Sequence, residues 1–129
     1  MKKIKYSMIL MIAILFFTQI AIAQQAADLK NKTPEQRAAF QTSMMKSKLN
    51  LDSDQVLKVQ VINLKYAQKF EPIIKSDDSR FSRFRQVKAL QKAKDAELKT
   101  VFTGSQYKQY QDFEAEMKEK LKDRMASNN

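Results

Sequence analysis

The 129-residue sequence contains no cysteine, no histidine and no tryptophan, and it has only one glycine and two prolines. Without cysteine the chain forms no disulfide and has no thiol nucleophile or lipid-bearing cysteine. Without histidine it lacks the commonest general base and the commonest transition-metal ligand. A single glycine leaves no glycine-rich phosphate loop and few tight turns, which argues against a hairpin-built β architecture. These absences point away from an enzyme and predict neither a metal site nor another cofactor.

The abundant residues favour helices. Lys, Gln, Ala, Leu, Met and Glu are frequent, and all have high helix propensity. The 24 basic residues outnumber the 14 acidic ones and give a net charge of +10. We therefore predict an all-α, strongly basic protein.

The first 23 residues resemble an export signal. Lys2, Lys3 and Lys5 precede an uncharged and mostly apolar stretch over residues 7–23, which ends in the small-x-small triplet Ala21-Ile22-Ala23. At about 17 residues, the stretch is at the short end of what spans a bilayer. We predict that residues 1–23 form a cleaved signal peptide, with an uncleaved membrane anchor as the alternative. In both cases the remaining chain lies outside the cytoplasm.

Export changes what the positive charge means. The signal removes three lysines and no acids from a chain of net charge +10, so the part from residue 24 carries +7. A basic protein of this size would otherwise suggest nucleic acid. An exported protein is a poor candidate for that partner. We expect anionic envelope surfaces or acidic, partly unfolded polypeptides instead, with no nucleic acid and no stable membrane insertion once the signal is removed.

The first helix start follows a stretch at 24–32 that lacks hydrophobic periodicity. Thr33 is suited to the N-cap, Pro34 to the first helical position, and Gln36 to the capping-box partner. We predict a flexible arm at 24–32 and a helix over about 34–48.

A second helix start lies at Leu51-Asp52-Ser53-Asp54-Gln55, where Asp52 and Gln55 have capping-box spacing. Pro72 should kink or end this helix near Glu71. Apolar residues follow a helical period on two sides of the segment, which predicts burial against the fold on one side and against a partner copy on the other. The second apolar side consists of Leu57, Val61 and Leu64.

Two further helices complete the predicted domain over residues 33–125. The turn residues at 76–79 predict a break, followed by a helix over about 79–101. Thr103 and Gln106 then repeat the capping-box spacing and open a helix to about Met125, before a polar tail at 126–129. The inward positions should be Phe84, Val87, Leu90, Leu98 and Val101 in the third helix, and Tyr110, Phe113, Met117, Leu121 and Met125 in the fourth.

The segment 79–102 holds most of the excess positive charge. Its cations recur at helical spacing, so they should share one face that only Asp95 interrupts. Such a one-sided charge costs self-repulsion in a small fold. We predict a client-binding surface here, with an ordinary solvated face as the competing interpretation. The candidate residues are Arg80, Phe81, Arg83, Phe84, Arg85, Lys88, Lys92 and Lys99, together with Met44 and Met45, although the residues themselves favour burial of the two methionines in the core.

The two helix starts at 51–55 and 102–106 lie 51 residues apart. With the weaker copy at 32–36, they resemble the repeated Leu-Thr-x-x-Gln motif of the Spy/CpxP family of periplasmic proteins. Asp52 stands where that motif has Thr, Phe102 where it has Leu, and Lys32 does not fit the Leu position. Read from the residues alone, Thr33, Gln36, Asp52, Gln55, Thr103 and Gln106 are helix caps rather than a binding site.

The resemblance implies an elongated, cradle-like arrangement of four helices that pairs as an antiparallel homodimer. It also implies a periplasmic, ATP-independent chaperone (holdase) that binds unfolded or aggregation-prone proteins through a basic, partly apolar face. The alternative is an envelope-stress adaptor that binds the domain of a sensor kinase. A structural or membrane-surface role is a third interpretation, favoured if the signal is retained. The family's metal-binding branch uses His or Cys ligands, which this chain lacks.

Overall fold

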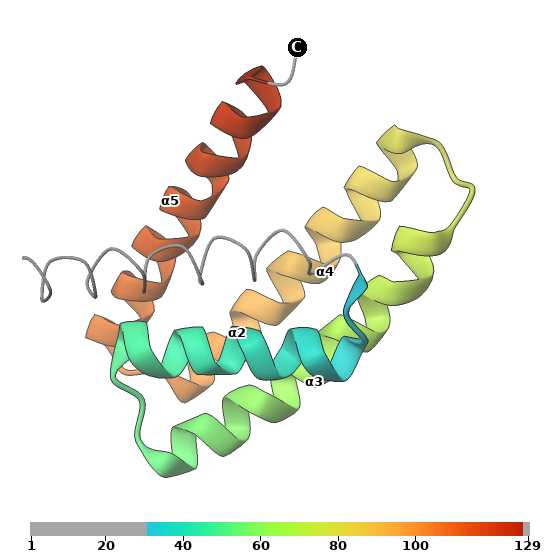
Figure 1. The fold of residues 1–129 in the computed structure, drawn as a ribbon. Helices are drawn as coiled ribbons and strands as arrows, with labels where there is room; N and C mark the ends of the chain where they lie inside the picture. Colours follow the sequence, from blue (N-terminus) through green and yellow to red (C-terminus); the bar gives the residue numbers. More distant parts are fainter. Residues whose placement is uncertain (1–30, 128–129) are drawn as a thin grey trace, which may run out of the picture. The chain divides into compact units, whose positions relative to one another are not determined.

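A computed structural model describes residues 31–127, except for the side chains of residues 121, 124 and 125. Within this range the chain forms four α-helices and no strand, which confirms the predicted all-α class (Figure 1). The predicted signal peptide, most of the predicted arm and the last two residues lie outside the described residues. The helices are α2 (Pro34–Leu49), α3 (Ser53–Lys75), α4 (Arg80–Val101) and α5 (Gly104–Ser127), all in one compact unit that starts at Pro34.

Two helices extend further than the sequence suggests. Helix α3 does not end near Glu71 but continues through Pro72 to Lys75. The hydrogen bond that Pro72 removes is the one to the carbonyl of Gln68, and that residue is exposed to water. Helix α5 extends to Ser127, so the first residues of the predicted polar tail are helical.

Helix α2 ends in a left-handed turn. Asn50 has a φ of 50°, a conformation that asparagine tolerates better than most residues. The Leu51 N–H then donates to the Lys46 carbonyl at 3.2 Å, which is the outer hydrogen bond of a Schellman motif. Leu51 is buried, so this turn fixes both the end of α2 and the first apolar contact of the next segment.

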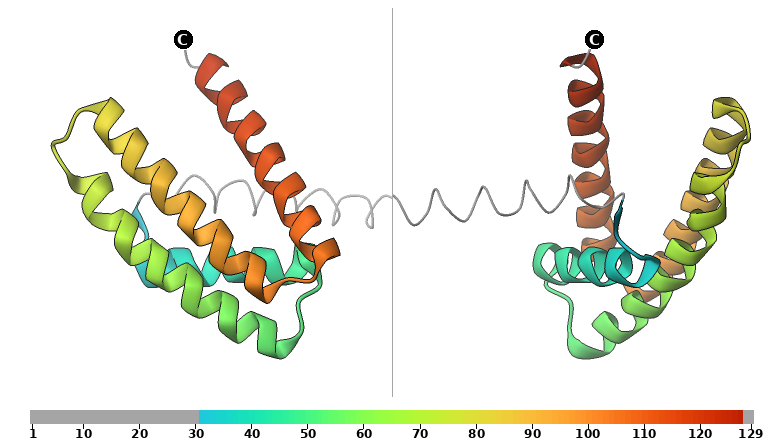
Figure 2. Two further views of the ribbon diagram at one scale, coloured as in Figure 1. Left: turned by 180° about the vertical axis from the view of Figure 1, so that it is seen from behind. Right: turned by 45° about the vertical axis from the view of Figure 1, so that its right-hand side comes forward.

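Helix α3 lies at the centre of the packing. It packs against α2 on one side and runs beside α4 in a helical hairpin, while α5 contacts α2 (Figure 2). The Lys65–Glu97 ion pair and the Tyr66 hydroxyl, which donates to Glu97 at 2.8 Å, join α3 to α4. Ion pairing between Arg37 and Glu71 joins α2 to α3.

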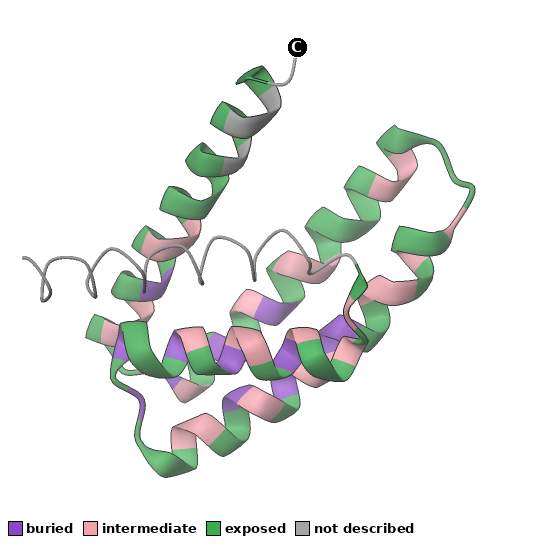
Figure 3. Cartoon of the chain, in the orientation of Figure 1, coloured by how far each residue is buried: buried purple, intermediate pink, exposed green. Residues whose placement is uncertain are grey.

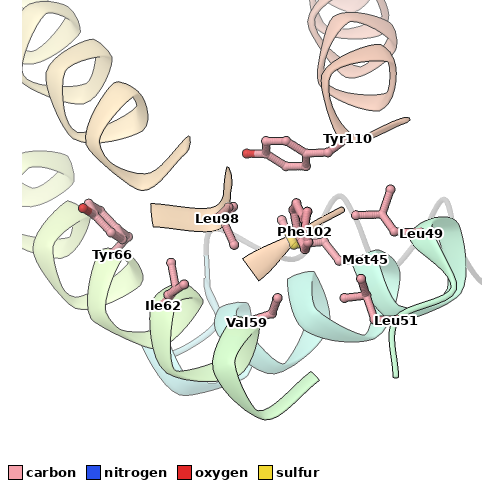
Figure 4. Packing of buried hydrophobic residues seen from close by; sticks show 9 residues of the cluster. All are labelled: Met45, Leu49, Leu51, Val59, Ile62, Tyr66, Leu98, Phe102 and Tyr110. Atoms are coloured by element: carbon pink, nitrogen blue, oxygen red, sulfur yellow. The ribbon is translucent and has the colours of Figure 1, made fainter. Parts of the chain in front are cut away.

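The hydrophobic core draws on all four helices and their connections (Figure 4). Figure 3 shows that buried positions concentrate around α2 and the parts of α3, α4 and α5 near it. Predicted inward positions farther along the helices are exposed: Phe84 by 63%, Val87 by 37% and Met117 by 44%. Helical periodicity gives the direction of a face but does not supply the element that covers it. The core residues are Met45, Leu49, Leu51, Val59, Ile62, Tyr66, Leu98, Phe102 and Tyr110.

Both later capping boxes form as predicted. The Asp52 carboxylate accepts from the Gln55 N–H at 2.8 Å, and the Gln55 side chain accepts from the Asp52 N–H at 3.1 Å. At the start of α5, the Thr103 hydroxyl accepts from the Gln106 N–H at 3.2 Å, and the Gln106 side chain accepts from the Thr103 N–H at 3.0 Å. Helix α2 begins at Pro34 as expected. The capping roles of Thr33 and Gln36 stay predictions.

The two motifs meet in space through their glutamines. The Gln55 amide donates to Oε1 of Gln106 at 2.7 Å, and the Gln106 amide donates back to Oε1 of Gln55 at 3.1 Å. Each amide also donates to a helix-end carbonyl, Gln55 to Val101 at 3.1 Å and Gln106 to Leu49 at 3.3 Å. Each glutamine therefore donates two hydrogen bonds and accepts two. Each also joins the start of one helix to the end of another.

We predict that Gln55→Ala and Gln106→Ala each lower the free energy of unfolding by about 2 kcal/mol, because each leaves a partner amide and a helix-end carbonyl unpaired. The double substitution should cost clearly less than the sum, since both single changes remove the same reciprocal pair. Urea unfolding of the three variants gives these values. The control is Gln109→Ala, at an exposed position of α5. Fully additive costs would show that the two glutamines act independently.

Candidate functional site

Helix α4 begins where the sequence predicts. The Ser79 hydroxyl accepts from the Ser82 N–H at 3.2 Å and caps the helix. The Gln86 side chain donates to Asp78 at 2.9 Å, which ties the preceding turn to the helix. The start of α4 and the register of its cations are thus fixed by local hydrogen bonds.

The cations of the third predicted helix lie on its exposed surface. Arg85, Lys88, Lys92 and Lys99 are all exposed, and no ion pair within residues 31–127 involves them. Two of them lie over aromatic rings: Arg85 is 5.8 Å from the centre of Phe81, and Lys99 is 5.5 Å from that of Tyr107. These contacts orient the cations without neutralising them.

The sequence suggested that Asp95 interrupts the positive face of α4, but it does not. It is half-buried, and its carboxylate accepts from the Tyr110 hydroxyl at 2.7 Å and from the Gln91 amide at 2.9 Å. The acid that helical spacing places beside these cations is therefore engaged with α5, and Glu97, the other acid of α4, is paired with Lys65 and Tyr66 of α3.

Aromatic side chains accompany the cations at the start of α4. Phe81 is 70% exposed and Phe84 is 63% exposed, with Arg80 exposed and Arg83 half-buried beside them. The buried residues of α4 are Lys94 and Leu98, both in its second half, so its first half is largely uncovered. We call Arg80, Phe81, Arg83, Phe84, Arg85, Lys88, Lys92 and Lys99 the α4 face.

The two methionines proposed for the same surface lie on α2 and have different surroundings. Met45 is only 6% exposed, and its sulfur lies 3.7 Å from the side-chain nitrogen of the buried Asn63. It belongs to the core, so its assignment to a client-binding surface was wrong. Met44 is half-buried.

A polar cluster between α4 and α5 was missed by sequence reasoning. Lys94 is 5% exposed and donates to the Gln41 side chain of α2 at 2.8 Å. Beside it, Gln91, Asp95, Tyr110 and Glu114 are joined by hydrogen bonds. Lys94 and Gln91 lie four and seven residues before the buried Leu98, which places them on the inward face of α4. Helical spacing could therefore have identified them. Within residues 31–127 no three acidic side chains gather as metal ligands would.

Burial lowers the pKa of Lys94 to about 8, against the attraction of Glu114 and Asp95. The unfolded chain, with an ordinary lysine pKa, therefore binds more protons above pH 8, so stability rises with pH in that window. The tyrosines act oppositely at higher pH. Burial and the hydrogen bond to Glu97 raise the pKa of Tyr66 to about 12, so its contribution to stability is lost as pH rises above about 10.

We predict that the free energy of unfolding rises by about 2 kcal/mol between pH 8 and pH 10, and that Lys94→Met abolishes most of this rise. Urea unfolding at three pH values measures it. Lys92→Met serves as the control, because Lys92 is exposed on the same helix. An unchanged pH slope in Lys94→Met would contradict the assignment to Lys94.

Among the described residues, no helix combines the length and the apolar character that crossing a bilayer requires. No curated protein and no solved structure matches the chain. A family model does match residues 23–110, a stretch that includes both capping boxes, the glutamine pair and the whole α4 face. That model is described as "Domain of unknown function (DUF4890)", and the chain belongs to this family.

Proposed function

We propose that this protein is an exported, ATP-independent chaperone of the holdase type, which binds unfolded or aggregation-prone proteins through the α4 face. The observation that carries the proposal is the combination of cations that form no ion pair with the described residues and two large aromatic side chains, Phe81 and Phe84, each more than 60% exposed on one helix. Large exposed apolar groups among polar ones are typical of interaction sites.

The α4 face suits a two-step encounter. The cations attract acidic segments from a distance and raise the rate of association in a salt-dependent way. Phe81, Phe84 and the aliphatic stems of the long cations then cover exposed apolar segments of the client. Because each contact is weak and the face lies on a single helix, a client stays free to change conformation while bound. The mechanism uses no nucleotide.

The motif resemblance to the Spy/CpxP family supports the same proposal. The resemblance supports two further proposals. One is export to the periplasm after removal of residues 1–23, and the other is that the partners are unfolded envelope proteins. A sensor-kinase domain is the competing partner, and it is an outcome of the test below.

We further propose that two copies associate in an antiparallel homodimer through α3. Leu57 and Val61 are 67% and 66% exposed, one helical turn apart on the side away from the core, with Leu64 half-buried beside them. Such a stripe on a central helix is suited to a symmetric copy of itself.

The chaperone proposal predicts that the chain from Gln24 suppresses the aggregation of two unrelated client proteins at near-stoichiometric ratios, and that raised salt weakens the effect. Light scattering of the clients measures it. Lys88→Glu with Lys92→Glu should reduce suppression several-fold, because the long-range attraction is removed. Phe81→Ser with Phe84→Ser should reduce it at all salt concentrations.

The matched control is Lys58→Glu with Lys108→Glu. It makes the same change in net charge at exposed positions of α3 and α5. Equal loss in both charge-reversal pairs would indicate a net-charge effect rather than a binding face. No suppression of either client would rule out the holdase, and a sensor domain would then be sought as the single partner.

The dimer proposal predicts that Val61→Asp weakens self-association by ~100-fold or more, because a buried valine contributes ~1.5 kcal/mol or more in each copy. Sedimentation velocity over a range of concentrations measures the change. Gln111→Asp, at an exposed position of α5, is the control. A chain that is monomeric at every concentration would contradict the proposal.

A further inference from the structure

The polar cluster between α4 and α5 holds two carboxylates on shared donors. The Gln91 amide donates to Oδ1 of Asp95 at 2.9 Å and to Oε1 of Glu114 at 2.8 Å. The Tyr110 hydroxyl contacts the same two oxygens, at 2.7 Å and 2.8 Å. Asp95 belongs to α4 and Glu114 to α5, so all four contacts join or support the two helices.

These contacts need one more proton than the donors supply. The Gln91 amide provides two N–H groups and the Tyr110 hydroxyl provides one O–H, which is enough for three of the four contacts. When Tyr110 donates to Asp95, its contact with Glu114 holds only if Glu114 carries a proton and donates to the tyrosine oxygen. With both carboxylates ionised and the Tyr110 proton donated to Asp95, no proton would lie between the Tyr110 oxygen and Oε1 of Glu114, which are 2.8 Å apart.

The burial of Glu114 favours its protonation. Burial raises the pKa of Glu114, and the negative charge of Asp95 on α4 raises it further. The Tyr110 hydrogen bond and the positive charges of Lys118 on α5 and Lys94 on α4 oppose the shift. Lys94 donates to Gln41, the uncharged group that α2 supplies, and so attracts Glu114 only through space.

Among the described side chains, Glu114 makes the last hydrogen bond between the two helices. Beyond it, the side-chain hydrogen bonds of the described part of α5 are local, from Lys120 to Glu116 and from Lys122 to Glu119.

We propose that Asp95, Tyr110 and Glu114 form a pH-sensitive clasp, which holds α5 against α4 while Glu114 is protonated and loosens when Glu114 ionises. On ionisation the proton leaves to solvent, and the one hydroxyl proton of Tyr110 is left for two negative carboxylates. Their repulsion then acts between the two helices. This clasp is independent of the proposed chaperone function, because it needs neither the α4 face nor a client.

A spin-label distance between the two helices tests the clasp. The chain has no cysteine, so labels are placed only where cysteine is introduced, at Ala89→Cys in α4 and Ala126→Cys in α5, both exposed. About 18 Å of helix separates Glu114 from Ala126, so a rotation of about 15° moves the label by ~5 Å. We expect such a shift between about pH 4 and about pH 8, with the same midpoint as the Glu114 carboxyl carbon signal in NMR.

Glu114→Gln is the informative variant, since its amide donates to Tyr110 at every pH and carries no charge. It should keep the low-pH distance throughout the titration. A label pair at Lys58→Cys and Ala89→Cys, within the α3–α4 hairpin, should show no shift and so excludes general unfolding. The proposal is overturned if Glu114 titrates at or below the ordinary glutamate value in the wild-type sequence. It is equally overturned if the distance fails to follow Glu114, or if Glu114→Gln shifts with pH as the wild type does.

Discussion

The reciprocal hydrogen bonds between Gln55 and Gln106 are the constraint on which the rest of the fold depends. They tie the start of α3 to the start of α5, and the same two amides donate to Val101 at the end of α4 and to Leu49 at the end of α2. Helix ends leave unsatisfied backbone groups, and their burial without partners is costly. Here two side chains satisfy those groups and each other at once. Four helices are thereby held at one junction, beside the rings of Phe102 and Tyr110, whose centres are 5.6 Å apart.

A junction of this kind leaves long parts of the helices uncovered. The buried residues of α4 lie in its second half, toward this junction, whereas its first half exposes Phe81 and Phe84. A small all-helical chain with no disulfide has few other ways to present apolar groups on a stable scaffold. The stripe on α3 is exposed for the same reason, since Leu57 and Val61 lie on the side away from the core.

The positive charges of α4 fall into two groups, which differ in their exposure to water. Cations on the α4 face are exposed except for the half-buried Arg83, so they act at a distance through water. Lys94 is buried one turn from Leu98 and pays a desolvation penalty, which lowers its pKa. It lies beside the carboxylates that join α4 to α5. Charge on α4 is therefore exposed to water on one side of the helix and engaged in helix packing on the other.

Local sequence patterns predicted the all-α class, the helix starts at Asp52 and Thr103, and the cationic spacing along α4, because caps and helical periods depend on neighbouring residues. They left two outcomes open for Pro72, which could end or kink the helix, and two for Met45, whose burial depends on α3. The packing of the helices decides that Gln55 meets Gln106, that Asp95 turns to Tyr110, and that Phe84 stays exposed. Each of these depends on which helix lies opposite, and a local pattern carries no information about contacts between residues far apart in the chain.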